Sequence, residues 1–474
     1  MSRINTNISS IQAIHRLAAN QNDLSLRLER LSSGLRINRG RDDPAGLIAS
    51  EALRSEITGL NQAVENSSRA INVIATAEGA LTEVSALLLD IRGLITKSAN
   101  EGALSPQEIE ANQLQVDSIL ASIDRIANTT QFNGVKLLNG TLDYTLSTPA
   151  TFASSINDVR VYSANIPEGY SQPVTVQVVA SAQVAAFTWA HSSLTSNATI
   201  QVTGTKGSQV FSFVSGMSAG AMASIINNSK DLTGVSATVN GSGTALILNS
   251  QQYGSSAFVS VHKIYDGTGT FTDTTAKGVD ADVRVNGIKT TTDGLHAYVR
   301  AGGLDLELTL TEVFGTQTAT SVAFGIKGGG ALFQLGPDVV PNGQYRMGIQ
   351  SVATGQLGNA QVGRLSEIGR DGTYSLVAGN YQQAQQIVAV AIQQVATLRG
   401  RLGGFQKNQL ETNINSQQIA LENVKASEST IRDADYAAET AAMTRAQILV
   451  QSTTQILAMA NQQPQNVLTL LKNM

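Results

Sequence analysis

Apolar residues recur every three or four positions over residues 4–128, which is the periodicity of amphipathic helices. One stripe of leucines steps by four, three and four, at Leu24, Leu28, Leu31 and Leu35. A stripe with this spacing lets one helix pack lengthwise on another. Asp43 then suits the N-cap of a second helix and Pro44 its first position. The pattern predicts a first helix before about residue 40, a second running to about residue 99, and a third over about residues 107–127.

From about residue 132 to residue 374 the pattern changes to two-residue alternation with glycine turns, which predicts strands. Residues 304–310 alternate at every step, and residues 235–248 predict a hairpin with its turn at 240–243. One helix, from Ser218 to about residue 228, interrupts the strands. We expect one or two β-rich domains in this block.

Helical periodicity returns from residue 381 to the end. We expect a helix to about residue 397, a break at the glycines of 400–404, a helix from 405 towards 425, and a last helix to about 471. The stripe of the last helix is Leu449, Ile456, Met459, Val467 and Leu470. The predicted fold class is α+β, with a long antiparallel helical bundle or coiled coil built from paired N- and C-terminal segments and a β-rich outer region inserted between them.

The leucine stripe at residues 24–35 has three interpretations: a core seam within the chain, a coiled-coil dimer, or a seam of a filament. A core seam is the default for any single stripe. Here, however, the stripes lie at the chain termini, beside Asn, Gln and Ser faces that carry few charges. Helices of this kind are better suited to being covered by other helices on all sides than to permanent exposure to water. We therefore favour filament packing.

Composition narrows the possible functions. The 474 residues are 42% hydrophobic, enough for ordered cores, and only 14% charged with a net charge of -4, so we expect neither nucleic acid nor an anionic membrane as a partner. The absence of cysteine excludes disulfides, thiolate zinc sites and cysteine nucleophiles. The first residues lack the apolar core of a secretory signal peptide, and no window approaches twenty apolar residues, so we expect no membrane span.

The sequence offers little catalytic chemistry. Its four histidines, His15, His191, His262 and His296, stand alone, and no His-Glu-x-x-His pair exists for zinc. The glycine runs at 204–208 and 328–330 lack the spacing of a phosphate-binding loop and indicate turns. We expect no catalytic, metal or cofactor site, and a protein that is not an enzyme.

Several longer motifs, taken together, point to a protein family. The N-terminal ones are Ser32-Ser33-Gly34-Leu35-Arg36-Ile37-Asn38, Asp42-Asp43-Pro44-Ala45-Gly46-Leu47, Ile123-Asp124-Arg125-Ile126 and Thr130-Gln131-Phe132-Asn133-Gly134. The C-terminal ones are Ala426-Ser427-Glu428-Ser429-Thr430-Ile431-Arg432-Asp433-Ala434-Asp435-Tyr436 and Ala460-Asn461-Gln462-Gln463-Pro464-Gln465. With these motifs in colinear positions, residues 1–140 and 375–474 resemble bacterial flagellins. Residues 200–261 are similar, less closely, to a strand-helix-hairpin insert of flagellar axial proteins.

The resemblance implies a structural subunit that polymerises into the bacterial flagellar filament for swimming motility. Residues 1–40 and 435–474 would form the inner filament core, 41–175 and 350–434 a rod-like helical domain, and 176–349 the variable β-rich outer region. The two terminal stripes would make the filament contacts. The resemblance also implies secretion through the flagellum's type III channel, and contacts with an export chaperone and with the hook-filament junction and cap proteins.

Other functions remain as alternatives. The nearest is a hook-filament junction protein, which shares the terminal helices, and the nearly full-length C-terminal motif favours flagellin over it. An enzyme whose terminal helices mediate oligomerisation would need a set of catalytic residues, and the β block lacks one. A coiled-coil adhesin would need a signal peptide.

The flagellin resemblance also concerns a vertebrate Toll-like receptor, which the family engages through a Gln-Arg-Val-Arg-Glu-Leu type of pattern. The matching stretch here is Leu89-Asp90-Ile91-Arg92-Gly93-Leu94. Arg92 and Leu94 are retained, whereas Asp90 replaces an arginine and Gly93 a glutamate. The resemblance therefore implies a degenerate receptor epitope and a poor agonist.

Overall fold

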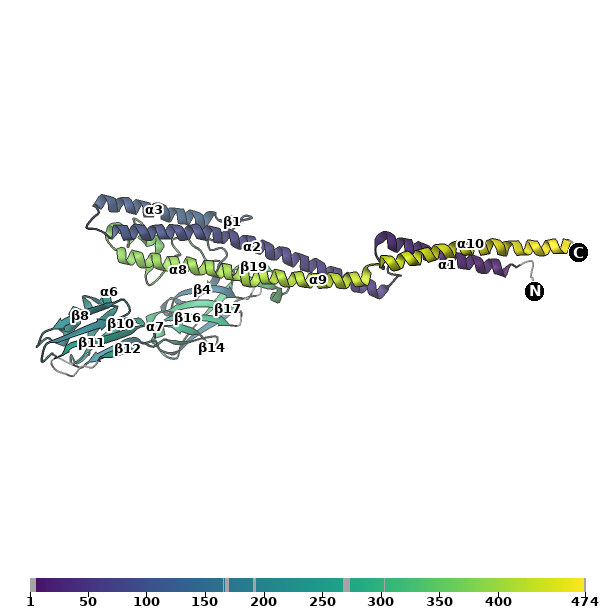
Figure 1. Cartoon of the computed structure of the whole chain (residues 1–474). Helices are drawn as coiled ribbons and strands as arrows, with labels where there is room; N and C mark the ends of the chain where they lie inside the picture. Colours follow the sequence, from purple (N-terminus) through teal and green to yellow (C-terminus); the bar gives the residue numbers. More distant parts are fainter. Residues whose placement is uncertain are drawn as a thin grey trace. The chain divides into compact units, whose positions relative to one another are not determined.

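The computed structural model describes residues 6–164, 166, 170–190, 193–266, 273–301 and 303–472, without the side chains of residues 266, 464 and 466–472. The chain divides into two compact units. Unit 1 contains Met1–Ser68, Gln334–Gly343 and Gln409–Met474, and unit 2 contains Arg69–Phe333 and Gln344–Asn408. The helix α2 runs from one unit into the other (Figure 1).

Unit 1 is helical. Its helices are α1 (Ile8–Ser33), the first part of α2 (Pro44–Ser98), α9 (Thr412–Arg432) and α10 (Tyr436–Lys472). α1 and α10 lie side by side, and α2 is joined to α9 by a hydrogen bond from Asn413 to Ser67 and an ion pair between Arg432 and Glu51. N- and C-terminal segments therefore pair within this unit, as the sequence pattern predicts.

Local capping fixes where the first two helices begin and end. The Asn7 side chain accepts a hydrogen bond from the Ser10 backbone N–H, and α1 ends at Gly34, whose φ of 73° favours glycine. The Asp43 side chain accepts from the Gly46 N–H at 2.9 Å, with Pro44 in the first turn. The predicted start of the second helix is confirmed. Leu35, however, lies beyond the end of α1 and forms a bridge with Asp433, so the predicted helical stripe stops at Leu31.

The long helices of unit 2 are the rest of α2, α3 (Pro106–Thr129) and α8 (Tyr381–Phe405). A reciprocal capping box between Ser105 and Glu108 starts α3. The buried Gln113 amide then ties α3 to the 3-10 segments η2 (Leu365–Ile368) and η3 (Leu376–Ala378), because it donates to the Ile368 carbonyl and accepts from the Leu376 N–H.

The predicted break at residues 400–404 is wrong. α8 continues through these glycines to Phe405, and a π-helical segment, Gln406–Glu411, connects it to α9. Leu398, Leu402 and Phe405 are buried on one face of α8, and the Phe405 ring stacks on Tyr345 with 4.5 Å between centroids. Tertiary packing on this face outweighs the roughly 1 kcal/mol that each glycine costs a helix.

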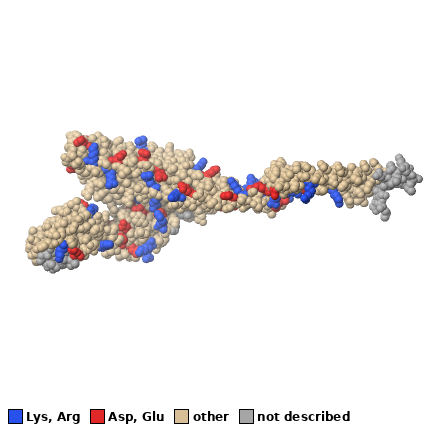
Figure 2. Space-filling model, in the orientation of Figure 1, with Lys and Arg blue, Asp and Glu red and all other residues tan. Residues whose placement is uncertain are grey.

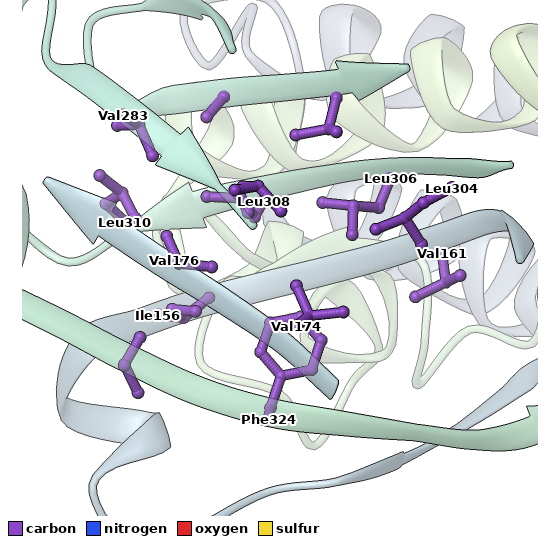
Figure 3. Close-up of a cluster of buried hydrophobic side chains, with 14 of the residues drawn as sticks. Ile156, Val161, Val174, Val176, Val283, Leu304, Leu306, Leu308, Leu310 and Phe324 are labelled. Carbon is purple, nitrogen blue, oxygen red and sulfur yellow. The ribbon is translucent and has the colours of Figure 1, made fainter. Parts of the chain in front are cut away.

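The β-rich part of unit 2 has two hydrophobic cores. The first lies between a five-stranded sheet, in the order β14-β13-β5-β18-β3, and a four-stranded sheet, in the order β15-β16-β17-β4 (Figure 3). Alternate leucines of β17, from Leu304 to Leu310, fill it, which confirms the strand predicted there. The strands and their short helices are β3 (Tyr144–Ser147), α4 (Phe152–Ser155), β4 (Ile156–Ala164), β5 (Gln172–Ala180), β13 (Asp282–Val285), β14 (Ile288–Lys289), β15 (Thr291–Asp293), β16 (His296–Ala301), β17 (Leu304–Leu310), α7 (Glu312–Gly315) and β18 (Thr320–Gly329).

The second core lies between the sheets β6-β10-β9 and β12-β11-β7-β8 and the helix α5. Its elements are β6 (Val184–Trp189), β7 (Ala198–Thr203), β8 (Ser208–Phe213), α5 (Ala219–Asn227), α6 (Lys230–Thr233), β9 (Val235–Val239), β10 (Leu246–Tyr253), β11 (Phe258–Asp266) and β12 (Thr274–Lys277). Ser218 caps α5, and Val239 pairs with Leu246, which confirms the predicted helix and hairpin. Short strand pairs outside these sheets are β1 (Gln131–Phe132) with β2 (Val135–Lys136), β19 (Ala331–Gln334) with β20 (Gln344–Met347), and β21 (Gly358–Asn359) with β22 (Gly363–Arg364). The 3-10 turn η1 (Pro341–Gly343) belongs to unit 1.

The expectation that no segment is apolar enough to span a membrane needs a correction. By length and composition alone, α2 is long and apolar enough to do so. The apolar residues that α2 buries in unit 2 are Ala70, Ile74, Ala77, Leu81, Val84, Leu88, Ile91 and Ile95. Their spacing of three and four residues is that of a helix face packed in a protein core, and core helices pass the same test.

Candidate functional site

The pair formed by α1 and α10, called the helix pair below, is held together by small and polar residues. Glu439, Ala446, Thr453 and Ala460 recur every seven residues along α10, and all four are buried. On α1 the facing positions are Ala13, Asn20 and Arg27, with the same spacing. A seven-residue repeat places side chains along one seam between two helices. This seam, however, contains no leucine or isoleucine at these positions.

Hydrogen bonds along the seam establish an antiparallel register. Near one end the Asn7 side chain donates to the Ala460 carbonyl at 2.7 Å. In the middle the Asn20 amide contacts the Thr453 hydroxyl at 3.4 Å, and near the other end the Tyr436 hydroxyl donates to the Leu31 carbonyl at 2.8 Å. Half-buried apolar residues also recur every seven residues on both helices, at Leu17, Leu24 and Leu31 and at Met443, Val450 and Leu457. The seam therefore combines polar contacts, which give it specificity, with apolar burial.

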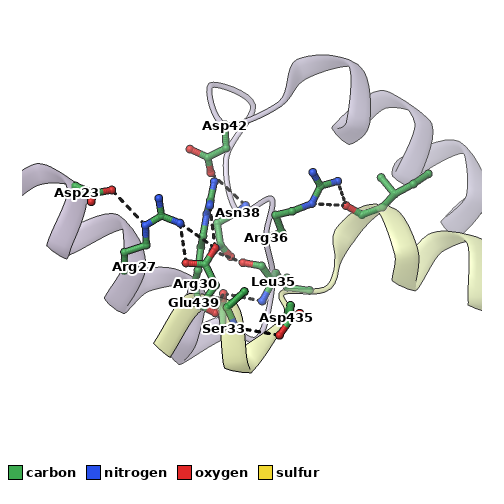
Figure 4. A network of polar contacts seen from close by, with 12 residues as sticks. Asp23, Arg27, Arg30, Ser33, Leu35, Arg36, Asn38, Asp42, Asp435 and Glu439 are labelled. Atoms are coloured by element: carbon green, nitrogen blue, oxygen red, sulfur yellow. Dashed lines mark hydrogen bonds and ion pairs between the residues drawn. The ribbon is translucent and has the colours of Figure 1, made fainter. Parts of the chain in front are cut away.

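One charged cluster, formed by Arg27, Arg30 and Glu439, lies at the end of the seam beside the α1–α2 connection (Figure 4). Arg27 Nη1 lies 2.9 Å from Glu439 Oε2, and Arg30 Nη1 lies 3.0 Å from Oε1. Burial disfavours ionisation of Glu439, but the hydrogen bonds from the two arginines outweigh it and hold the pKa of this carboxyl below its usual value. The same contact with Glu439 raises the pKa of Arg27. The cluster is therefore fully charged at neutral pH.

Large apolar side chains lie outside this seam and are exposed. We call this set the apolar surface of the helix pair; it comprises Ile8, Ile11, Ile14, Leu28, Ile448, Leu449, Ile456 and Met459. Ile456 is 51% exposed and Met459 is 69% exposed. Spacings of three and seven residues place Leu449, Ile456 and Met459 on one side of α10. A helix pair that exposes isoleucine and buries alanine is suited to contacts with further helices.

Charge is also distributed unevenly along the helix pair. α10 carries Glu439 and Arg445 near its start, and then no charged residue until Lys472. Figure 2 shows the charged side chains of this region gathered around the charged cluster, with a mostly uncharged surface along the rest of the pair. An uncharged apolar surface can be covered by another helix without the cost of burying ions.

The residues of the two stripes predicted from the sequence differ in their exposure. Leu24, Leu31 and Leu35 are half-buried in unit 1, whereas Leu28, Leu449, Ile456 and Met459 are exposed. The side chains of Val467 and Leu470 lie outside the described residues. Sequence reasoning missed Ile8, Ile11 and Ile14, although their three-residue spacing was visible. It also missed the small buried residues of the seam, because alanine and threonine carry little hydrophobic signal.

The remaining candidate residues do not converge on a chemical site. Among the described residues no group of three His, Asp or Glu side chains is placed to hold a metal ion. His262 pairs with Asp273, His296 contacts the Thr309 hydroxyl at 3.0 Å, His15 is exposed, and His191 lies outside the described residues. Of the degenerate receptor pattern on α2, Asp90 and Arg92 are exposed and Leu94 is half-buried.

Comparison with known proteins places these features in context. Residues 4–143 match the model of the bacterial flagellin N-terminal helical region, and residues 385–471 match that of the C-terminal helical region. The chain is 30% identical to a flagellin of Salmonella choleraesuis over 99% of both chains, and 31% identical to flagellin B of Vibrio cholerae over 99% of both. Among solved structures it is similar to a flagellar hook associated protein-3 of Legionella pneumophila, at 13% identity and a TM-score of 0.31 over 80% of this chain and 98% of that one. That likeness is too weak to bear on function.

Proposed function

The chain belongs to the bacterial flagellin family, and from this premise we propose that its helix pair makes the contacts that hold its copies together. Flagellins are structural subunits that polymerise into the extracellular filament of the flagellum, and this chain is such a subunit. The proposal is supported by the apolar surface: its isoleucines are exposed, while alanine and threonine occupy buried positions of the seam. Polymerisation offers those side chains the partners that a single copy lacks.

The proposed layering of the filament follows from the difference between the helix pair, which exposes apolar side chains, and the β-rich modules, which bury theirs. Residues 1–40 and 435–474 form its inner core, residues 41–175 and 350–434 a helical rod around the core, and residues 176–349 the outer region. The apolar surface of the helix pair supports an inner position, because α10 has no charged residue between Arg445 and Lys472 and can be covered there at little electrostatic cost. The β-rich modules support an outer position, since each already encloses its own core.

Polar substitutions on the apolar surface test this proposal. We expect Ile11→Gln and Ile456→Gln each to raise the critical concentration for polymerisation roughly tenfold or more, because each removes an anchor worth about 1.5 to 3 kcal/mol when fully buried. Both side chains are exposed in the free subunit, so its helicity should change little. Pelleting assays and electron microscopy of filaments give the readout.

Val313→Gln is the matched control, because Val313 is also an exposed apolar residue but lies in α7 of the β-rich part. Its critical concentration should equal that of the unsubstituted chain. If Ile11→Gln and Ile456→Gln also polymerised at the unsubstituted concentration, the helix pair would not be the subunit interface.

Family membership also supports a proposal about secretion and partners. We infer export through the flagellum's own type III channel, and contacts with an export chaperone and with the hook-filament junction and cap proteins. A strain without a working flagellar export gate should then retain the chain inside the cell.

A hook-filament junction role has less support, because the relatives that match over nearly the full chain are flagellins. The role that we propose is structural and requires no catalytic site or cofactor.

The degenerate receptor pattern supports a separate proposal, that this chain activates the flagellin-sensing Toll-like receptor poorly. Asp90 and Arg92 are exposed on α2, so a receptor can reach them in the free subunit. An acidic side chain where the family pattern has arginine costs about 2 to 5 kcal/mol at a buried contact. We expect Asp90→Arg to restore part of the signal in a reporter-cell assay. Equal potency of the unsubstituted chain and of flagellins with the intact pattern would contradict this proposal.

A further inference from the structure

Ten residues of the middle region belong to the helical unit. The segment Gln334–Gly343, called the tongue below, lies between two strands of unit 2 in sequence but groups with unit 1 by its contacts. Pro337 packs on Gly59 of α2 so closely that a Cβ at Gly59 would lie 3.1 Å from the Pro337 Cβ. The Asn413 amide of α9 donates to the Leu335 carbonyl at 2.9 Å. The tongue is therefore anchored on both α2 and α9.

The tongue also fixes its own conformation. The N–H groups of Leu335 and Gly336 both donate to the Gly343 carbonyl, at 2.8 and 2.9 Å. The Gln334 amide reaches inward to the Gly336 and Asp338 carbonyls. Pro337 and Pro341, two of the eight prolines of the chain, restrict the backbone further. A segment ordered in this way loses little conformational entropy when a partner binds it.

This rigid turn presents two apolar side chains at its tip. Val339 is 82% exposed and Val340 is 47% exposed. Tight turns ordinarily carry Gly, Asn, Asp, Ser or Pro, and a valine pair held away from its own chain gains nothing there for folding. The flanking prolines remove backbone donors, so the tip is unsuited to pairing as an edge strand. Its chemistry favours side-chain contact with an apolar surface.

We propose that the tongue is a contact between subunits, in which Val339 and Val340 pack on the helical surface of a second copy of this chain. The inference rests on the proposed function, because it requires a polymer. A second copy fits as the partner because the tongue is fixed to the unit that carries the apolar surface. In a polymer of identical subunits every copy then offers both the tongue and its receiving surface, as a heterologous contact requires. The exposed isoleucines Ile48 of α2 and Ile419 of α9 give the neighbour an apolar surface outside the helix pair.

Site-specific cross-linking tests the contact, since the chain has no cysteine of its own. Val339→Cys is labelled with a benzophenone maleimide, polymerised as a mixture of 14N and 15N subunits, and irradiated. We expect mixed-isotope cross-links from the tongue to α2 or α9 in filaments and none in dilute free subunits. Val313→Cys, at a comparably exposed valine of the β-rich part, serves as the control and should give no cross-link to α2 or α9.

A paired substitution provides a second measurement. Val339→Ser with Val340→Ser should raise the critical concentration several-fold, by about tenfold if both side chains become buried, and leave the unfolding temperature of the free subunit unchanged. Absence of intermolecular cross-links in well-formed filaments, together with an unchanged critical concentration, would overturn the tongue contact and leave the proposed function intact. Failure of the unsubstituted chain to polymerise would overturn both.

Discussion

Removal of residues 455–474 is expected to abolish polymerisation while unit 2 stays folded. The deleted segment contains Ile456 and Met459 of the apolar surface, and Ala460, whose carbonyl receives the hydrogen bond from Asn7. Burial of Ile456 and Met459 against neighbouring copies would contribute about 1.5 to 3 kcal/mol each. Their loss alone should raise the critical concentration roughly a hundredfold or more, beyond the range of ordinary assays. Pelleting and electron microscopy measure polymer, and circular dichroism of the free subunit measures its fold.

The control for this truncation is the full-length chain with Gln462→Ala and Gln463→Ala, which changes two exposed polar residues of the same segment. It should polymerise like the unsubstituted chain. Filaments of normal length and stability from the truncated chain would show that the C-terminal part of α10 makes no essential contact.

Replacement of Glu439 by alanine is expected to have the next largest effect. Glu439 is buried in the seam and is the only partner that the described residues provide for both Arg27 and Arg30 at once. Alanine would leave Arg30 without its carboxylate and Arg27 with Asp23 alone, both guanidinium groups being partly buried, at a cost of about 3 kcal/mol to the α1–α10 pairing. Filaments of this variant should melt at a lower temperature, and proteolysis should cut α1 faster. Glu422→Ala, at an exposed glutamate of α9, should change neither measurement.

The direction of the Glu439 shift also predicts a pH dependence. Because the folded-state pKa of Glu439 is lowered, its contribution to pairing is complete above the unfolded value of about 4.3 and is lost as the pH falls through the folded value. Glu439→Gln should remove this part of the acid sensitivity, so that variant and unsubstituted filaments differ in stability at pH 7 and the difference shrinks as the pH falls below about 4.3. A constant difference across that range would contradict the role assigned to the carboxylate.

Features determined by neighbouring residues could be predicted from the sequence. Asp43 and Pro44 define a helix start because the cap and the first turn involve only adjacent positions. The hairpin of β9 and β10 follows from its two-residue period and its glycine turn. In each case the interaction that decides the structure lies within a few residues of the signal.

Features determined by distant partners could not be predicted in this way. The glycines of 400–404 indicate a break locally, but burial of Leu402 and Phe405 keeps α8 continuous. The leucines of residues 24–35 are conspicuous in the sequence, but the buried Ala446 and Thr453 of the seam are not, because their burial depends on the register with α1. The tongue is equally hidden, because only the fold brings Pro337 to Gly59.

Hydroxyl-radical footprinting of the unsubstituted chain, read by mass spectrometry, tests most directly whether polymerisation covers the apolar surface of the helix pair. In the free subunit Ile11, Ile456 and Met459 are exposed and should be oxidised readily. In filaments we expect strong protection of all three, while Val313 of the β-rich part stays as reactive as before. Equal oxidation of Ile11, Ile456 and Met459 in free subunits and in filaments would contradict this expectation.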